Sequence, residues 1–110
     1  MMRDGLIVAR TGHIDTSAII DFTPRRGSGC THVNQIARVH PSAAGCEDCL
    51  KIGGRWVHLR LCLICGHVGC CDSSPNRHAT AHHHATKHPI MRSMEPGEEW
   101  GWCFVDEVVL

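Results

Sequence analysis

Hydrophobic positions along this chain fall in short runs that glycine, proline and polar residues separate. The clearest alternation covers residues 56–61 and leads directly into Cys62; the Gly53-Gly54 pair before it predicts a hairpin turn. Strict alternation of apolar and polar positions is the pattern of a half-buried strand. It places Val57, Leu59 and Leu61 on one face, and Trp56, His58 and Arg60 on the other.

A helix and two further strands follow. Ser74 and Pro75 suit the N-cap and the first helical position, and the helix is expected to run to about Thr86. His88 precedes Pro89 and ends it, because a residue before proline avoids helical angles. Residues 89–94 and 100–110 predict two strands joined by a turn at 95–98. The predicted fold class is α+β: a small zinc-stabilised domain with a twisted antiparallel sheet and one main helix packed against it.

The pattern of apolar residues is less distinct in the N-terminal part of the chain. Residues 6–9 and 18–22 are apolar runs that suit short strands, the second alternatively a helical turn. We expect residues 1–29 to form a partly flexible extension, ordered or disordered in part, and residues 30–110 to form the domain itself. Within the domain, residues 33–39 suit a short helix or strand.

Length, charge and composition limit the kinds of protein that this chain can be. With 110 residues there is length for one domain, and the formal net charge of zero gives no general attraction to nucleic acid or to an anionic membrane. No apolar run approaches the roughly 18 residues of a membrane span, and we expect a monomer. Eight of the residues counted as hydrophobic are cysteines, so the apolar core is small. Bound metal must therefore supply much of the stability.

The candidate chemistry lies between residues 46 and 88. Two Cys-x-x-Cys pairs are followed by a cysteine and three histidines, two of them one helical turn apart; the residues are Cys46, Cys49, Cys62, Cys65, Cys70, His78, His82 and His88. Thiolates two residues apart converge on one ion, and eight donors suffice for two closed tetrahedral zinc sites. Spacing alone leaves open which donors share an ion.

Other interpretations of these cysteines are weaker. A disulfide framework normally accompanies secretion, and the N-terminal residues lack the apolar core of a signal peptide. We therefore expect a reducing compartment, the cytoplasm. A thioredoxin-like redox role would need a surrounding βαβ pattern, which the sequence does not show.

A third donor group is incomplete. Cys30 and His32 form a Cys-x-His pair, and Cys103 is the remaining cysteine downstream that can close a site with them. Residues 102–106 return the chain toward this pair.

These residues resemble the UBP-type zinc finger, the ubiquitin-binding finger of ubiquitin-specific proteases and of a cytoplasmic histone deacetylase. The resemblance covers about residues 30–108, and stretches 66–74 and 95–98 are similar to its small stand-alone prokaryotic branch. It implies that the ligands interleave. One ion would be held by Cys46, Cys49, Cys70 and His78, and a second by Cys62, Cys65, His82 and His88.

The resemblance also implies a third site. It would use Cys30, His32, Cys103 and a fourth cysteine three residues later, where this chain has Asp106. A carboxylate can bind zinc, so we expect two zinc ions and, with Asp106 as a ligand, a third. The alternative is a corner that packs without metal.

The family's function is to grip the free C-terminal Gly-Gly of ubiquitin in an aromatic pocket, with an arginine that meets the carboxylate. The implied partner is thus a protein or peptide C-terminus, and Trp102 and Phe104 match the pocket's aromatic positions. Where members have Gly-Arg-Tyr, this chain has residues 71–73, Cys-Asp-Ser, and Asp72 would repel a carboxylate. The candidates to replace the missing arginine are Arg60, Arg77 and Arg92. The alternative is that each of them is an ordinary surface residue.

Two other functions compete with tail binding. The first is a purely structural zinc domain with no pocket. The second is an enzyme, since His78 and His82 have the spacing of a zinc protease, but Ala79 stands where the general-base glutamate belongs. Closed sites also leave no open coordination position, so we expect no enzymatic activity. His83 and His84 are expected on the solvent side of the helix.

Overall fold

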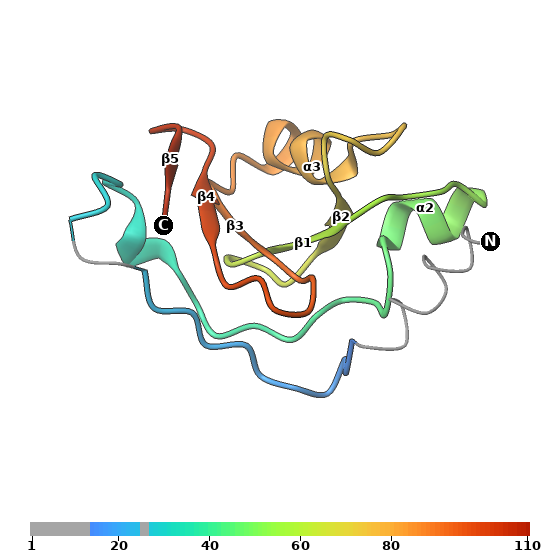
Figure 1. The fold of residues 1–110 in the computed structure, drawn as a ribbon, viewed down its shortest axis with the longest axis horizontal. Helices are drawn as coiled ribbons and strands as arrows, with labels where there is room; N and C mark the ends of the chain where they lie inside the picture. The colour runs from blue at the N-terminus through green and yellow to red at the C-terminus, as the bar shows by residue number, and fades with distance from the viewer. Residues whose placement is uncertain (1–13, 25–26) are drawn as a thin grey trace.

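The computed structural model describes residues 14–24 and 27–110, which build one antiparallel sheet between a helix and an N-terminal segment. Figure 1 shows helix α3 on one side of the sheet and the described part of residues 14–45, here called the N-terminal segment, on the other. The predicted strand at residues 6–9 lies outside the described residues. The α+β class is confirmed.

Five strands form the sheet in the order β2-β1-β3-β4-β5, and every neighbouring pair is antiparallel. Their bounds are β1 Leu59–Cys62, β2 Val68–Cys70, β3 Ile90–Ser93, β4 Gly101–Cys103 and β5 Val108–Val109. The region predicted as one strand over 100–110 thus contains two, joined by a turn at 104–107. The first strand also begins later than predicted: Trp56 is 5% exposed and Val57 is 40% exposed, against the expected alternation.

The pleat of the sheet separates two sets of side chains. Residues directly opposite one another share a face, so Met91, Trp102 and Val109 lie together, on the same side as Arg60 of β1. The other face carries Leu61, which pairs with Arg92. The first set turns toward α3 and the second toward the N-terminal segment.

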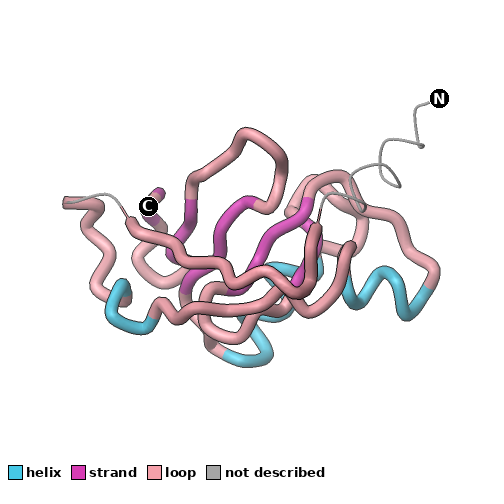
Figure 2. The backbone as a smooth tube through the Cα atoms, turned by 90° about the horizontal axis from the view of Figure 1, so that it is seen from below, coloured by secondary structure: helices cyan, strands magenta, loops and turns pink. Residues whose placement is uncertain are grey.

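The core is small and lies mainly under the N-terminal segment. Its fully buried members are strand and loop residues: Leu59, Leu61, Leu63, Val68 and Ile90. Ile14, Phe22 and Val39 from the N-terminal segment close it, each no more than 8% exposed. This segment, which Figure 2 shows crossing the strands as an extended loop, is therefore part of the core.

Two backbone contacts fix the path of the segment. Ile20 and Val39 exchange N–H···O bonds of 2.8 and 3.2 Å, and the amide of Ala37 donates to the carbonyl of Leu63 at 2.9 Å. Further along, Gly66 has φ +86°, and a Cβ there would lie 2.1 Å from the carbonyl oxygen of His40. Only glycine permits that approach. Residues 33–35 form a single 3-10 turn, η1 Val33–Gln35.

Helix α2, Glu47–Ile52, begins at the first metal-binding pair and was not predicted. The Sγ of Cys46 accepts from the amide of Cys49, and Gly53 ends the helix at φ 67°. Gly53 is thus a left-handed helix cap instead of the predicted hairpin turn.

Helix α3, His78–Thr86, ends where predicted but starts three residues later than Pro75. The reason is that Ser74 is buried and its hydroxyl accepts the amide of Val57 at 2.8 Å, so it does not cap the helix. Arg77 takes the N-cap position instead, with φ 46°.

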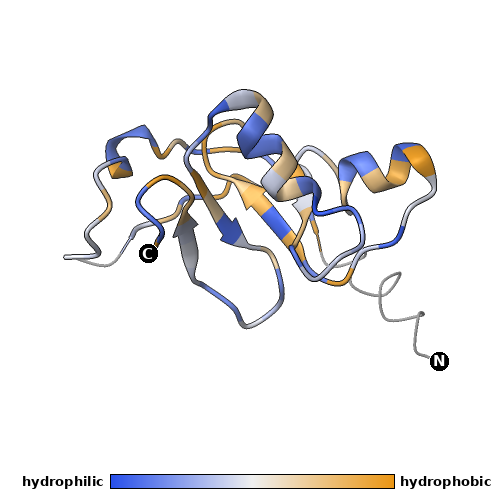
Figure 3. Ribbon diagram, turned by 90° about the horizontal axis from the view of Figure 1, so that it is seen from above, coloured by the Kyte–Doolittle hydropathy of each residue, from blue (hydrophilic) through white to orange (hydrophobic). Residues whose placement is uncertain are grey.

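No residue of α3 is buried, and Figure 3 colours this helix largely hydrophilic. A nine-residue helix is not stable alone, and without a fully buried side chain its apolar packing contributes little. It lies against β2 at Gly69, where a Cβ would come within 2.7 Å of the amide of Ala79. Among residues 14–24 and 27–110, no helix has the length and apolar character that a membrane crossing requires.

Candidate functional site

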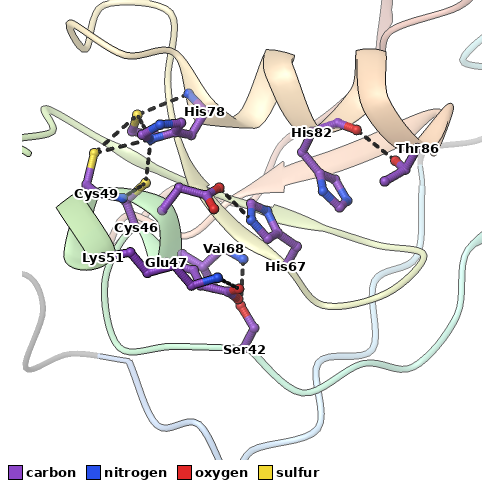
Figure 4. A network of polar contacts seen from close by, with 12 residues as sticks. Ser42, Cys46, Glu47, Cys49, Lys51, His67, Val68, His78, His82 and Thr86 are labelled. Atoms are coloured by element: carbon purple, nitrogen blue, oxygen red, sulfur yellow. Dashed lines mark hydrogen bonds and ion pairs between the residues drawn. The ribbon is translucent and has the colours of Figure 1, made fainter.

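The first donor cluster joins α2, β2 and α3. It consists of Cys46 and Cys49 at the start of α2, Cys70 at the end of β2, and His78 at the start of α3. The three sulfurs lie 3.3, 3.3 and 3.6 Å from Nδ1 of His78, and the Cys49 and Cys70 sulfurs lie 3.9 Å apart. Figure 4 shows Cys46, Cys49 and His78 pointing toward one another.

These distances fit a tetrahedral zinc ion. Zn–S bonds of about 2.3 Å and a Zn–N bond of about 2.0 Å at tetrahedral angles put the donor atoms roughly 3.5–3.8 Å apart. Without metal, a hydrogen bond between Cys46 and Cys70 lowers the pKa of Cys70 to about 5 and raises that of Cys46. Zinc binds cysteine as the thiolate, so a bound ion would displace the proton that Cys46 retains.

The second cluster joins β1 to α3. It contains Cys62, Cys65, His82 and His88. Sγ of Cys62 lies 3.5 Å from Nδ1 of His88, and Sγ of Cys65 lies 3.4 Å from Nε2 of His82. Burial lowers the pKa of His82 to about 4, so its imidazole is neutral at pH 7. Neutral imidazole is the form that binds zinc.

A bridge connects these two clusters. The ring of His67 stacks on His82 with centroids 4.2 Å apart, and its Nε2 lies 2.9 Å from a carboxylate oxygen of Asp48. Asp48 stands between Cys46 and Cys49 in α2, so the pair ties the first cluster to a ligand of the second. Figure 4 shows His67 in this position beside His82.

The third cluster joins the N-terminal segment to β4 and the turn after it. Its members are Cys30, His32, Cys103 and Asp106. Nδ1 of His32 lies 3.6 Å from Sγ of Cys103 and 3.0 Å from a carboxylate oxygen of Asp106. The sulfur, nitrogen and oxygen donors also suit zinc.

The carboxylate of the third cluster is held by the segment opposite. The amide of Thr31 donates to Oδ2 of Asp106 at 2.7 Å, and the Thr31 hydroxyl donates at 3.0 Å. The amide bond above all lowers the pKa of Asp106 to about 2. The carboxylate is thus ionised at neutral pH, as a metal ligand must be.

The structure brings together the donors of the first two clusters in the interleaved arrangement that the family resemblance implied. A sequential pairing, with Cys46 and Cys49 beside Cys62 and Cys65, would need β1 to turn back onto α2, whereas β1 instead lies between β2 and β3. Cys71, next to Cys70, lies outside all three clusters and lines a separate pocket.

The pocket lined by Cys71 lies between α3 and the sheet and has a volume of 640 Å³. Three aromatic side chains from β4 and its flanks line it: Trp100, Trp102 and Phe104. They lie two residues apart, so the strand pleat turns them to one side. Phe104 is braced from behind by His83, whose ring stacks on it at 4.5 Å. The expectation that His83 faces solvent is therefore wrong.

The remaining lining is mixed. Met91 and Val109 extend the apolar wall, and α3 contributes Ala79 and Thr80. Residues 71–73 also line the pocket, so Asp72 lies at the pocket as the family resemblance implied.

Among the three candidate arginines, Arg60 lines the pocket. Arg92 lies on the opposite face, with its guanidinium 5.7 Å from the ring of Phe22, and Arg77 is exposed before α3. Sequence reasoning named Trp102 and Phe104 but missed Trp100 as a lining residue. The spacing of two between these aromatics was the signal that could have found it.

Comparisons with known proteins agree with this geometry. The family described as "Zn-finger in ubiquitin-hydrolases and other protein" matches residues 46–109. Protein RPA1320 from Rhodopseudomonas palustris, solved by solution NMR, is 65% identical with a TM-score of 0.69, over 74% of this chain and 80% of that one. The comparison with curated proteins found no match. The chain is a zinc-binding module, and it belongs to the UBP-type zinc-finger family.

Proposed function

We propose that this chain is a protein-interaction module in which zinc holds an aromatic pocket that receives the free C-terminal tail of a partner, of the Gly-Gly type. The observation that carries the proposal is the pocket of 640 Å³ walled by Trp100, Trp102 and Phe104. Its volume falls within the range of ligand-binding pockets, and amphipathic aromatic rings are the side chains that interfaces favour.

The three clusters support a scaffold role for three zinc ions. The first two clusters hold α3, which supplies one wall of the pocket, and the third holds the start of the domain against β4. Four protein donors around each ion leave no open coordination position, so the proposal does not include an enzymatic reaction.

A purely structural domain is the competing function. It gives no reason for three aromatic side chains to line an open pocket instead of packing into the core, which would bury more apolar surface. The pocket therefore favours tail binding.

An NMR titration tests the proposal. The zinc-loaded protein is titrated with a peptide ending in free Gly-Gly and with the same peptide amidated at its C-terminus. We expect shifts at the indole N–H signals of Trp100 and Trp102 with the free acid, and weak or no shifts with the amide. Trp102→Leu should abolish binding, whereas Val105→Ala, at an exposed residue outside the pocket, should not. No shift with either peptide would leave the structural domain as the function.

A further inference from the structure

A second hollow lies between α2 and α3. It is a groove of about 500 Å³, and residues 78, 81, 82 and 85 of α3 form one of its walls. The residues of α3 that line the aromatic pocket are instead 79 and 80. Glu47 and Asp48 of α2 and His67, which directly precedes β2, also line the groove. The groove is therefore separate from the aromatic pocket, and nothing in the proposed function uses it.

Two carboxylates and one imidazole converge in this groove. One ligand atom from each of Glu47, Asp48 and His67 lies within 4.8 Å of the other two. Nε2 of His67 lies 2.9 Å from a carboxylate oxygen of Asp48. Two donor atoms that each lie about 2.1 Å from one ion, at right angles, are about 3.0 Å apart. The imidazole and this carboxylate therefore have the spacing of neighbouring ligands in an octahedral site.

The fold holds these donors in place. The side chain of His67 is only 13% exposed, and its ring stacks on His82 with the two planes 3° from parallel. Glu47 and Asp48 lie in the first turn of α2, directly beside the cysteines of the first cluster. Donors that are already positioned lose little conformational freedom when they bind, so more of the interaction energy appears as affinity.

The charges around the groove favour a cation. Glu47 and Asp48 contribute two negative charges, and Lys51 contributes one positive charge. The first cluster, loaded with zinc, adds one more negative charge, because its three thiolates outweigh the double charge of the ion. The second cluster, with two thiolates around one zinc, is neutral. A further divalent ion in the groove is therefore attracted, even beside two zinc ions.

Lys51 is the cation that Glu47 contacts when no metal is bound. Its Nζ lies 3.2 Å from Oε2 of Glu47, and Figure 4 shows the two side chains together near His67. The side chain of Lys51 is 66% exposed, so it can turn into solvent at little cost. Glu47 also accepts a hydrogen bond from the hydroxyl of Ser42, which keeps the carboxylate in place when the lysine leaves.

We propose that Glu47, Asp48 and His67 form a fourth metal site, which binds one divalent transition-metal ion of the zinc or nickel type. Nε2 of His67 and one oxygen of each carboxylate are the ligands, and water fills the remaining positions. The ion replaces the proton between His67 and Asp48, which passes to solvent, and the ammonium of Lys51. Imidazole and carboxylate donors suit such ions, but a site without thiolates holds zinc less tightly than the cysteine clusters do. The fourth site therefore exchanges its ion while the structural zinc stays bound.

The test is an NMR titration of the zinc-loaded chain with Ni²⁺, a paramagnetic ion that broadens the signals of nuclei near it. Ni²⁺ prefers square-planar or octahedral surroundings, so it should leave zinc in the tetrahedral thiolate clusters, and zinc released into solution is measured as a check. We expect the signals of Glu47, Asp48 and His67 to broaden first, and binding to saturate at one equivalent. Calorimetry of the same sample with Zn²⁺ should show one equivalent beyond the structural zinc.

Two pairs of variants identify the ligands. His67→Gln should weaken Ni²⁺ binding by at least the roughly 10–100-fold that loss of a group beside a metal ligand costs. His84→Gln, at an exposed histidine of α3, should leave binding unchanged. Lys51→Gln should tighten binding about two- to fivefold, because it removes an exposed ion pair that competes with the metal. Lys87→Gln changes the other lysine of the chain and should have no effect.

A gain of affinity cannot come from a damaged fold, so Lys51→Gln keeps the test decisive if His67→Gln disturbs the second cluster through His82. Glu47→Gln, which leaves the stacked histidines in place, should weaken binding. Opposite shifts in Glu47→Gln and Lys51→Gln would support the site. Equal affinities in these two variants would overturn it, as would broadening that begins at His84 instead of His67.

Discussion

The first two donor clusters and the third hold the molecule in different ways. Clusters one and two use thiolate and imidazole donors only, and they join α2, β1, β2 and α3. The third cluster replaces one thiolate with the carboxylate of Asp106 and joins the N-terminal segment to β4. Apolar packing also attaches the N-terminal segment, since Phe22 and Val39 of this segment are buried in the core.

This difference indicates which parts of the fold depend on metal for their attachment to the sheet. Helix α3 has no buried residue, so its attachment depends largely on its own donors His78 and His82 and on His88 just after it. The N-terminal segment has apolar anchors of its own, so its third cluster adds to an attachment that exists without it. Loss of metal should therefore have unequal consequences in the two regions.

The largest effect should come from a ligand of the first cluster. Cys70→Ser removes a thiolate from a buried site, and structural zinc contributes on the order of 10–16 kcal/mol, comparable with the whole stability of a domain. We expect loss of NMR dispersion and of bound zinc. Cys71→Ser makes the same chemical change at the next residue, outside the clusters, and should keep both. Equal behaviour of the two variants would mean that Cys70 is not a ligand.

A smaller effect should follow from removing the apolar anchor of the N-terminal segment. Phe22 is 8% exposed, and its ring packs closely against Gly101. Phe22→Ala should lower the free energy of unfolding by about 3 kcal/mol, measured by denaturant titration with zinc present. Ile19→Ala, at a residue 60% exposed in the same segment, should change it by less than about 0.5 kcal/mol. A negligible effect of Phe22→Ala would show that metal alone holds the segment.

The smallest effect on stability should come from the carboxylate of the third cluster. Asp106→Asn removes the ionised donor but keeps its shape, so the protein should lose one zinc equivalent while the sheet and α3 keep their NMR signals. Glu107→Gln, the neighbouring exposed carboxylate, is the matched control and should retain all metal. Unchanged metal content in Asp106→Asn would remove Asp106 from the ligand set.

The sequence predicted the sheet-and-helix class because alternation and metal-ligand spacing are local patterns. It misplaced the start of α3 because Ser74 bonds to Val57, a contact between residues far apart in the chain. Alternation also failed at Trp56, which is buried before β1 begins, since burial there is decided by tertiary packing.

The candidate site was predictable to a similar degree. Trp102 and Phe104 were identified from the resemblance, and simple strand periodicity would have added Trp100. Which arginine enters the pocket could not be read from the sequence. Arg60 and Arg92 both lie on strands, and only the register of β1 with β3 shows that they face opposite sides.

The metal-held helix has a further consequence. Ala79 and Thr80 of α3 are part of the pocket wall, so the pocket is complete only while the first two clusters hold the helix. Two ligands that favour the same folded state must strengthen one another, and the coupling is equal in both directions. Under the proposed function, bound zinc would raise the affinity for a tail, and a bound tail would raise the affinity for zinc by the same factor.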